Sequence, residues 1–230
     1  MLASFMDRFN PLMIAVLIGW VLLVCKHEFA HALVANVGGD RSVRRHGYLS
    51  HPLNYIHPVY SILIPVLFLA MGGIPLPGAA VMVDERSLRS RAWASLVSLA
   101  GPLSDVVGFV RLGLAISPAV GLVDVSAAEL PTWVDLVGTL VFLGRYVVVL
   151  NLMPIPPLHG FNTIAPYLPE QAVWRLCQPQ VSLTILVVFF LILWRVPLVA
   201  GALASVVWRG IMLLGLDPFL ISDALRQTFG

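Results

Sequence analysis

The chain has 230 residues, of which 59% are hydrophobic and only 11% are charged, whereas about 25% of the residues of a soluble domain are charged. This composition excludes a water-soluble globule, because so few charged side chains cannot cover the surface of a core this apolar. At roughly 20 apolar residues per helical span, the chain can hold five or six spans. The net charge of +2 does not indicate nucleic-acid binding, and two cysteines do not indicate a disulfide framework.

The first apolar segment runs from Pro11 to Cys25. It is not expected to be a signal peptide, because the preceding residues carry one acid and one base rather than a positive charge. The Lys26-His27-Glu28 sequence is also too polar for a cleavage region. We expect this segment to continue as a helix to about Val37, where two glycines end it.

This helix carries the pattern His27-Glu28-x-x-His31. Residues four apart share one face of a helix, so the two histidines can present ring nitrogens to one zinc ion, with Glu28 beside it as a base. Zinc lowers the pKa of a bound water from about 15.7 to about 7, and a carboxylate can accept the proton that this water releases. The pattern also arises by chance in soluble helices, where the histidines only satisfy each other. Inside an apolar span such residues are costly to keep, which favours a metal site.

The depth of this candidate site follows from the rise of a helix. At 1.5 Å per residue, His27 lies about 24 Å beyond Pro11, along a bilayer core roughly 30 Å thick. We therefore expect the site to be recessed toward the cytoplasmic side. Its water path is expected to be lined by the polar loop from Asp40 to His57.

The next apolar segment, Pro58 to Ile74, is short and contains a proline in its middle. Basic residues flank it on both sides, so a full crossing would put one basic cluster on the wrong face. A re-entrant segment that returns to the cytoplasm keeps both clusters there. The clusters are Arg41, Arg44 and Arg45 before the segment, and Arg86, Arg89 and Arg91 after it.

Further spans are expected over Ala92–Pro118, Trp133–Met153, Val181–Trp194 and Val196–Leu216. The loop from Ala119 to Thr132 then lies on the opposite face, and it contains no Lys or Arg. The last two spans are expected to meet in a tight exterior turn at Arg195–Pro197, so that the tail with Arg226 returns to the cytoplasm. The prediction is an all-α polytopic membrane protein with about five transmembrane helices plus one re-entrant segment. Six full spans are the alternative, and a short β segment is expected on the cytoplasmic face.

A catalytic zinc site usually has three protein ligands, so two histidines do not complete it. The second candidate constellation is Asn151-Leu-Met-Pro-Ile-Pro-Pro-Leu-His159-Gly160. Three prolines in four positions exclude a regular helix there, at the end of a span. In a membrane, this is tolerated where the backbone lines a cavity.

Together these motifs resemble the site-2 protease family of intramembrane zinc metalloproteases. The resemblance rests on His-Glu-x-x-His in one span, Ala100-Gly101-Pro102 in a second, and Asn-x-x-Pro-x-Pro-x-Leu followed by a ligand position and Gly. It covers about residues 15 to 170 and is strongest to the small prokaryotic branch. It implies a three-span core that cleaves single-span membrane protein substrates within the bilayer. In this family, zinc is held by both motif histidines and an aspartate.

By this resemblance, His27 and His31 match the ligands, Glu28 the base and Asn151 the motif asparagine. His159 stands where the family has its aspartate. Three-histidine zinc sites are catalytically competent. With three neutral imidazoles the zinc site would keep a net charge of +2, whereas an aspartate ligand reduces this charge to +1. The higher charge should lower the pKa of the bound water further but make the resulting hydroxide a weaker nucleophile. Alternatively, the departure marks an inactive relative or a protein altered to trap the site.

His159 can meet His27 only if an odd number of crossings separates their helices, which holds if Pro58 to Ile74 is re-entrant.

Other polar residues have two interpretations each. The loop residues His46, His51 and His57 could be ligands or gates, but solvated loop positions are commoner. An internal pair or snorkelling is expected for Asp105, Arg111 and Arg145. Asn151 either donates to an oxyanion or serves only the helix end.

The sequence thus predicts a single membrane-embedded domain over residues 1–230, with a metalloprotease core over 11–170 and accessory spans over 181–216. The expected function is an intramembrane zinc metalloprotease with one Zn²⁺ per chain, acting on a single-span membrane protein. The alternative is an inactive relative that serves as a membrane binding or scaffold protein. The expected location is the plasma membrane, with several crossings and the active site toward the cytoplasm. Substrate is expected to add to the edge of the β segment, Gly78 to Asp84.

Overall fold

The computed structural model describes residues 10–51, 54, 81–120, 122–124 and 130–229, and its regular secondary structure there is entirely helical. The elements in chain order are α2 (Pro11–Gly38), α3 (Ser42–Arg45), the 3-10 helix η3 (Glu85–Ser87), α5 (Arg91–Ile116), α6 (Thr132–Asn151), α7 (His159–Ile164), the 3-10 helix η4 (Ala165–Tyr167), α8 (Glu170–Leu176), α9 (Pro179–Arg195), α10 (Pro197–Met212) and α11 (Pro218–Phe229). This part of the chain is all-helical, as the composition predicts.

The ends of α2 follow from local chemistry. The side-chain oxygen of Asn10 accepts a hydrogen bond from the N–H of Met13 at 2.7 Å, and Pro11 occupies the first turn, where a missing N–H costs nothing. The helix ends at Gly38 because Gly39 has a φ of +127°, a conformation that side-chain-bearing residues rarely adopt. The predicted stop at two glycines is confirmed.

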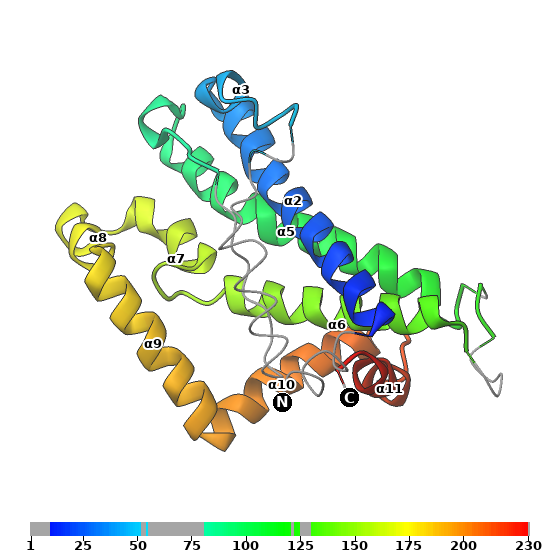
Figure 1. The fold of residues 1–230 in the computed structure, drawn as a ribbon. Helices are drawn as coiled ribbons and strands as arrows, with labels where there is room; N and C mark the ends of the chain where they lie inside the picture. Colours follow the sequence, from blue (N-terminus) through cyan, green and yellow to red (C-terminus); the bar gives the residue numbers. More distant parts are fainter. Residues whose placement is uncertain (1–9, 52–53, 55–80, 121, 125–129, 230) are drawn as a thin grey trace.

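The helices α2, α5 and α6 pack along one another and form the centre of the molecule (Figure 1). Between α2 and α6, a buried cluster contains Val16, Trp20, Val24, Leu140, Leu143 and Val147. The other side of α2 is apolar but open, with Ile14, Ile18 and Leu22 exposed by 48%, 59% and 65%. A helix that is apolar on both its packed and its open side is the kind that lipid surrounds.

Three helices, α2, α5 and α6, are long and apolar enough to cross a membrane, and the pair α8 and α9, bent by 68° at their junction, would make a fourth span. Helix α10 is apolar but only 16 residues long. The described residues therefore contain three or four candidate spans and do not confirm the predicted five, and the predicted re-entrant segment Pro58 to Ile74 lies outside them. The tight turn at Arg195–Pro197 is present, since α9 ends at Arg195 and α10 begins at Pro197.

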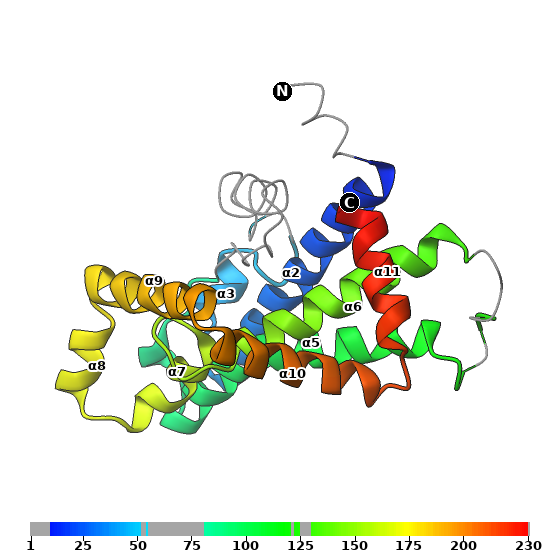
Figure 2. The same cartoon turned by 90° about the horizontal axis from the view of Figure 1, so that it is seen from below.

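Helix α11 lies at the end of the bundle opposite the histidines, beside the first turns of α2 and α6 (Figures 1 and 2). The side chain of Asn10 donates to the carbonyl of Gln227 at 3.0 Å, and the hydroxyls of Thr139 and Thr228 are hydrogen-bonded at 2.9 Å. The tail with Arg226 thus packs at the end of the bundle away from the histidines, whereas the sequence predicts that this tail returns to the cytoplasm. The sequence offers no local signal for this packing, which depends on a groove formed by other helices.

The segment Val81 to Asp84 forms no strand, so the predicted β segment is absent from the described residues, and residues 78–80 lie outside them. Its backbone instead binds side chains of α2 and the loop after it. The N–H of Val81 donates to Glu28 at 3.0 Å, and the N–H of Asp84 donates to Asp40 at 2.8 Å. Carboxylates take the hydrogen bonds that a strand partner would have formed.

Candidate metal centre

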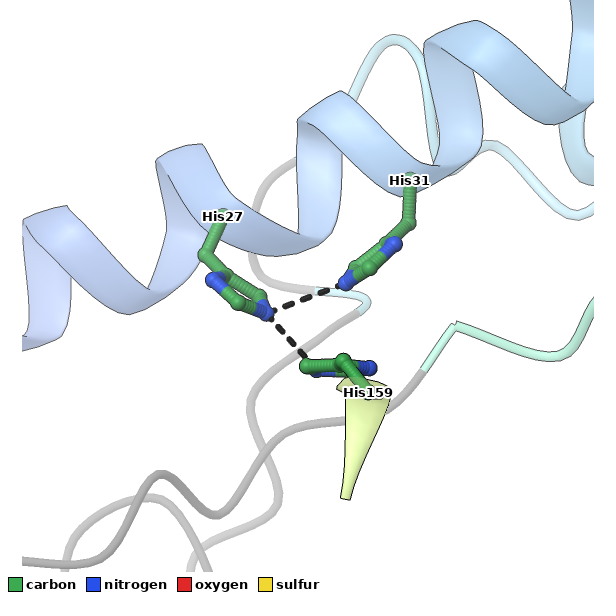
Figure 3. A group of neighbouring side chains, drawn as sticks. All are labelled: His27, His31 and His159. Atoms are coloured by element: carbon green, nitrogen blue, oxygen red, sulfur yellow. Dashed lines mark hydrogen bonds between the residues drawn. The ribbon is translucent and has the colours of Figure 1, made fainter. Parts of the chain in front are cut away.

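Three imidazoles converge between α2 and the start of α7. His27 and His31 lie one turn apart on the same face of α2, and His159, the first residue of α7, points toward both (Figure 3). Only 3% of His27 and 6% of His31 is exposed. The Nε2 atoms of His31 and His159 each lie 3.0 Å from Nε2 of His27. No other group of three metal-ligating side chains occurs in the described part of the chain.

Hydrogen bonds on the far side of two rings fix which nitrogen faces the centre. Nδ1 of His31 donates to the carbonyl oxygen of Val97 at 2.6 Å, and Nδ1 of His27 donates to the carboxylate of Asp105 at 2.6 Å. With the proton on Nδ1, each neutral ring presents the lone pair of Nε2 to the centre. Such a partner on the second ring nitrogen is typical of metal-ligating histidines.

The three candidate ligand atoms lie within 4.8 Å of one another, and two of their separations are close to those around a tetrahedral zinc ion. With zinc–nitrogen bonds of 2.0–2.1 Å, two ligands at adjacent corners of a tetrahedron lie about 3.3 Å apart. The two Nε2 separations of 3.0 Å are close to this value, and three protein ligands leave the fourth corner open. Lone pairs that face each other at this distance repel, so the donor set is suited to a cation. His27, His31 and His159 can therefore hold a zinc ion.

The polypeptide after α6 brings His159 to this point. Leu158 closes a turn with the carbonyl of Ile155 at 2.7 Å, and α7 begins at the next residue. A Cβ on Gly160 would overlap the carbonyls of Leu152 and Met153, so only glycine lets α7 start so close to the end of α6. Burial and the nearby His31 and His27 lower the pKa of His159 to about 2, which keeps its ring neutral and able to bind a metal.

Gly101 of α5 lies directly against two of the imidazoles. A Cβ at this position would overlap the Nε2 atoms of both His31 and His27. Helix α5 thus forms the wall of the centre with its bare backbone. The middle motif of the sequence, Ala100-Gly101-Pro102, is therefore a part of the site that contributes space rather than a functional group.

Glu28 is buried, with 5% of its surface exposed. Together with His31 and His159 it lines a cavity of about 190 Å³, and the other side of this cavity is formed by Val81, Val83 and residues of α5. One carboxylate oxygen of Glu28 accepts the N–H of Val81. The cavity therefore holds a carboxylate and two of the three candidate ligands, as a water or a peptide bond would require.

A wider groove of about 760 Å³ lies between the start of α5 and the α7–α8 region. It shares Glu85, Leu88, Ala94 and Asn162 with the smaller cavity, so the groove and the cavity lie next to each other. The sequence predicts that the loop from Asp40 to His57 lines the water path to the site. None of the described residues of that loop lines the groove or the smaller cavity.

The remaining predicted residues lie in several places. Asn151 ends α6 and is 5% exposed, and its Nδ2 has no hydrogen-bond partner in the described residues. Neither His46 nor His51 joins the histidine group, and His57 lies outside the described residues. The guanidinium of Arg145 lies over the ring of Phe109, 5.5 Å from its centre.

Asp105 is the residue whose role the sequence reasoning missed. The expected internal pair exists, because its Oδ1 lies 3.2 Å from Nζ of Lys26. The hydrogen bond from its other oxygen to His27 was not expected. A signal was present in the sequence, since Asp105 follows Gly101 by four positions and so shares its helix face. The residue of α2 that Asp105 contacts depends on how α5 is aligned along α2, and the sequence alone does not give this alignment.

Comparisons with known proteins agree with this geometry. Over 168 residues the chain is 39% identical to a Mycolicibacterium smegmatis protein named "Putative zinc metalloprotease Rip2", a match that covers 70% of this chain and 62% of that protein. A Mycobacterium tuberculosis (strain H37Rv) protein of the same name is 39% identical over 197 residues, which is 85% of this chain and 72% of the relative. "Putative zinc metalloprotease YwhC" of Bacillus subtilis is 30% identical over 178 residues, which is 71% of this chain and 75% of the relative.

No protein-family model matches the chain, and no solved structure matches it. The chain spans less than two thirds of the M. smegmatis relative but more than two thirds of the other two. The shared sequence therefore extends well beyond a single motif. The chain belongs to the site-2 protease family of zinc metalloproteases.

Proposed function

We propose that the chain is an intramembrane zinc metalloprotease that hydrolyses peptide bonds of single-span membrane proteins. The observation that carries this proposal is the convergence of three shielded imidazoles beside a cavity that Glu28 also lines. The names of the relatives support a zinc-dependent protease. The apolar surfaces of α2, α5 and α6 support a site within the membrane.

In this proposal, His27, His31 and His159 hold one zinc ion per chain. When bound there, zinc supplies a Lewis acid that lowers the pKa of water and polarises a carbonyl. Glu28 takes the proton from the attacking water and delivers it to the nitrogen of the leaving amine. The N–H of Val81 binds Oε2 of Glu28, which orients the carboxylate and leaves Oε1 for the proton.

Two further groups would act on the substrate. The unpartnered Nδ2 of Asn151, buried at the end of α6, is proposed to donate a hydrogen bond to the carbonyl oxygen as it gains negative charge. The segment Val81–Asp84 borders the cavity through Val81 and Val83, and we propose that an unwound substrate lies along it. Helical peptide bonds are poorly accessible, so the substrate must extend there before it is cleaved.

The proposed location is the plasma membrane with the site toward the cytoplasm. The end of the bundle near the site carries exposed arginines, among them Arg44 and Arg89, and basic residues favour the cytoplasmic side of a membrane. The described residues 119, 120, 122–124, 130 and 131 of the opposite loop contain no basic residue.

The test uses purified protein, a generic single-span reporter and a chelator. Glu28→Gln is expected to abolish cleavage while about one zinc per chain is retained, because the base is not a ligand. Glu85→Gln is the matched control, since Glu85 lines the same cavity without contacting the histidines, and it should retain most of the activity. Undiminished cleavage by Glu28→Gln, or loss of zinc from it, would contradict the role assigned to Glu28.

A further inference from the structure

The carboxylate of Asp105 joins α5 to α2 at the level of the metal centre. Only 8% of Asp105 is exposed. Its Oδ2 accepts Nδ1–H of His27 at 2.6 Å, and its Oδ1 lies 3.2 Å from Nζ of Lys26. Nζ of Lys26 also donates to the carbonyl of Ser104 at 2.6 Å. Each oxygen of the carboxylate therefore has its own partner on α2.

The two α2 histidines differ in what lies behind them. Nδ1 of His31 donates to a neutral carbonyl, that of Val97, whereas Nδ1 of His27 donates to a charged group. Both contacts fix the tautomer and the ring orientation. A carboxylate in addition draws the Nδ1 proton toward itself and makes Nε2 a stronger donor to a metal. His27 is thus the one α2 ligand through which negative charge can reach the centre.

We propose that Asp105 is a positioning residue for His27 and supplies the negative charge that a ligand set of three neutral histidines lacks. The inference rests on the zinc site of the proposed function. The carboxylate acts through the imidazole of His27 and not as a ligand, because both of its oxygens are engaged by α2.

Lys26 has a separate role in this arrangement. Its side chain is 35% exposed and contacts Asp105 through the oxygen that faces away from His27. Water screens a charge that is exposed to this degree, so Lys26 reduces the field of the carboxylate at the metal only in part. It offsets the cost of a carboxylate within the bundle, while the hydrogen bond with His27 Nδ1 orients the other carboxylate oxygen.

The first measurement is the affinity of purified full-length variants for Zn²⁺ and Co²⁺, by competition with a chromophoric chelator. Asp105→Asn should bind about 10- to 100-fold more weakly, as expected for loss of the carboxylate behind a histidine ligand. Its Co²⁺ absorption bands should also shift. Lys26→Met is the matched control, because it removes the other partner of the same carboxylate, and its affinity should stay close to that of the parent.

The second measurement separates charge from orientation. In a His159→Asp background the ligand set already carries a negative charge, so Asp105→Asn should cost much less affinity there than in the parent. An equal loss of metal affinity in both backgrounds would overturn the proposal that Asp105 supplies negative charge. Only its role in orienting the ring of His27 would then remain. Parent-like affinity and an unchanged Co²⁺ spectrum in Asp105→Asn would overturn the whole inference.

A variant that leaves the half-buried ammonium of Lys26 beside a neutral group could fail to fold. The double variant Lys26→Met/Asp105→Asn removes both charges together and should show the same loss of affinity, because the polar partners of the Lys26 side chain are Ser104 and Asp105 and not the ring of His27. These readouts need no proteolysis. A parent that binds zinc through Asp105-dependent histidines but cleaves no reporter would refute the proposed function alone.

Discussion

Gly101 controls how closely α5 approaches the imidazoles, and its substitution tests the centre without touching a ligand. Gly101→Ala places a methyl group where Nε2 of His27 and His31 lie, and neither ring can move without losing its Nδ1 hydrogen bond. We expect the affinity for zinc to fall at least tenfold, which is about the loss typical when a group that supports a ligand is removed. The zinc content of the purified protein should fall accordingly. Metal analysis of the purified protein measures it.

Gly144→Ala is the control for this substitution. Gly144 is also buried between helices, but a Cβ there would meet only the Cβ of Phe109 at an ordinary 3.5 Å. This variant should keep about one zinc per chain. Retention of zinc by Gly101→Ala as well would show that the metal does not bind between these rings.

The role of His159 is tested by three substitutions. His159→Ala should weaken zinc binding well over tenfold, because a ligand should matter at least as much as the group behind one. His159→Asp restores the family's ligand set and should retain zinc, with activity equal to or above that of the parent. His159→Asn is uncharged and should bind zinc more weakly than the Asp variant.

Calorimetry or metal analysis decides among these outcomes. Parent-like zinc binding in all three variants would place His159 outside the ligand set. Cleavage by the Asp variant of a reporter that the parent leaves intact would identify the parent as a disabled protease and favour the scaffold alternative.

At the scale of elements, Asp40 holds the segment Val81–Asp84 against α2. Asp40 is 1% exposed, and its carboxylate accepts the N–H groups of Ser42 and Asp84, both at 2.8 Å. Burial alone would raise the pKa of Asp40, but these hydrogen bonds and the nearby Arg45 lower it below its usual value. The ionised form is therefore favoured in the folded protein.

This shift predicts a pH dependence with a definite sign. A folded-state pKa below the unfolded value of about 3.9 stabilises the protein above that pH, and the contribution is lost as the pH falls through the lowered pKa. The parent should therefore lose more thermal stability between pH 6 and pH 3 than Asp40→Asn, which should be the less stable of the two at pH 6. Parallel pH profiles of Tm would contradict this.

The sequence predicts where individual helices begin and end better than it predicts which helices and side chains they pack against. The ends of α2 and the common face of His27 and His31 follow from a capping asparagine, two glycines and the period of a helix. The hydrogen bond from His27 to Asp105 depends on the register between two helices, for which no local pattern exists. The strand expected at Val81 failed for a similar reason, because distant carboxylates bind its N–H groups.

At the scale of the whole molecule, the arrangement of the helices predicts a labelling pattern. After Cys25 and Cys177 are replaced by Ser, single cysteines at positions 44 and 89 should react with a membrane-impermeant thiol reagent from the cytoplasmic side only. A cysteine at position 226 should react from the other side, because α11 packs at the far end of α2 and α6.

Mass tagging of intact cells and of inverted vesicles distinguishes the two sides. Labelling of positions 44 and 89 from opposite sides would make Pro58 to Ile74 a true span. Labelling of position 226 from the same side as position 44 would mean that α2 and α6 do not cross the bilayer in the proposed way.

The ion pair between Lys26 and Asp105 has a consequence for how the protein enters the membrane during synthesis. A lysine or an aspartate at the centre of a lone span costs roughly 2.5–3.5 kcal/mol on insertion, and each offsets the other only when α2 and α5 lie together. Position 105 lies 79 residues after Lys26, which at 5–20 residues per second corresponds to about 4 to 16 s of translation. Throughout that interval α2 is an incomplete span with its polar face unmatched. The ion pair therefore forms only after α5 has been made, and its formation lowers the cost of holding both charges once α2 and α5 pack together.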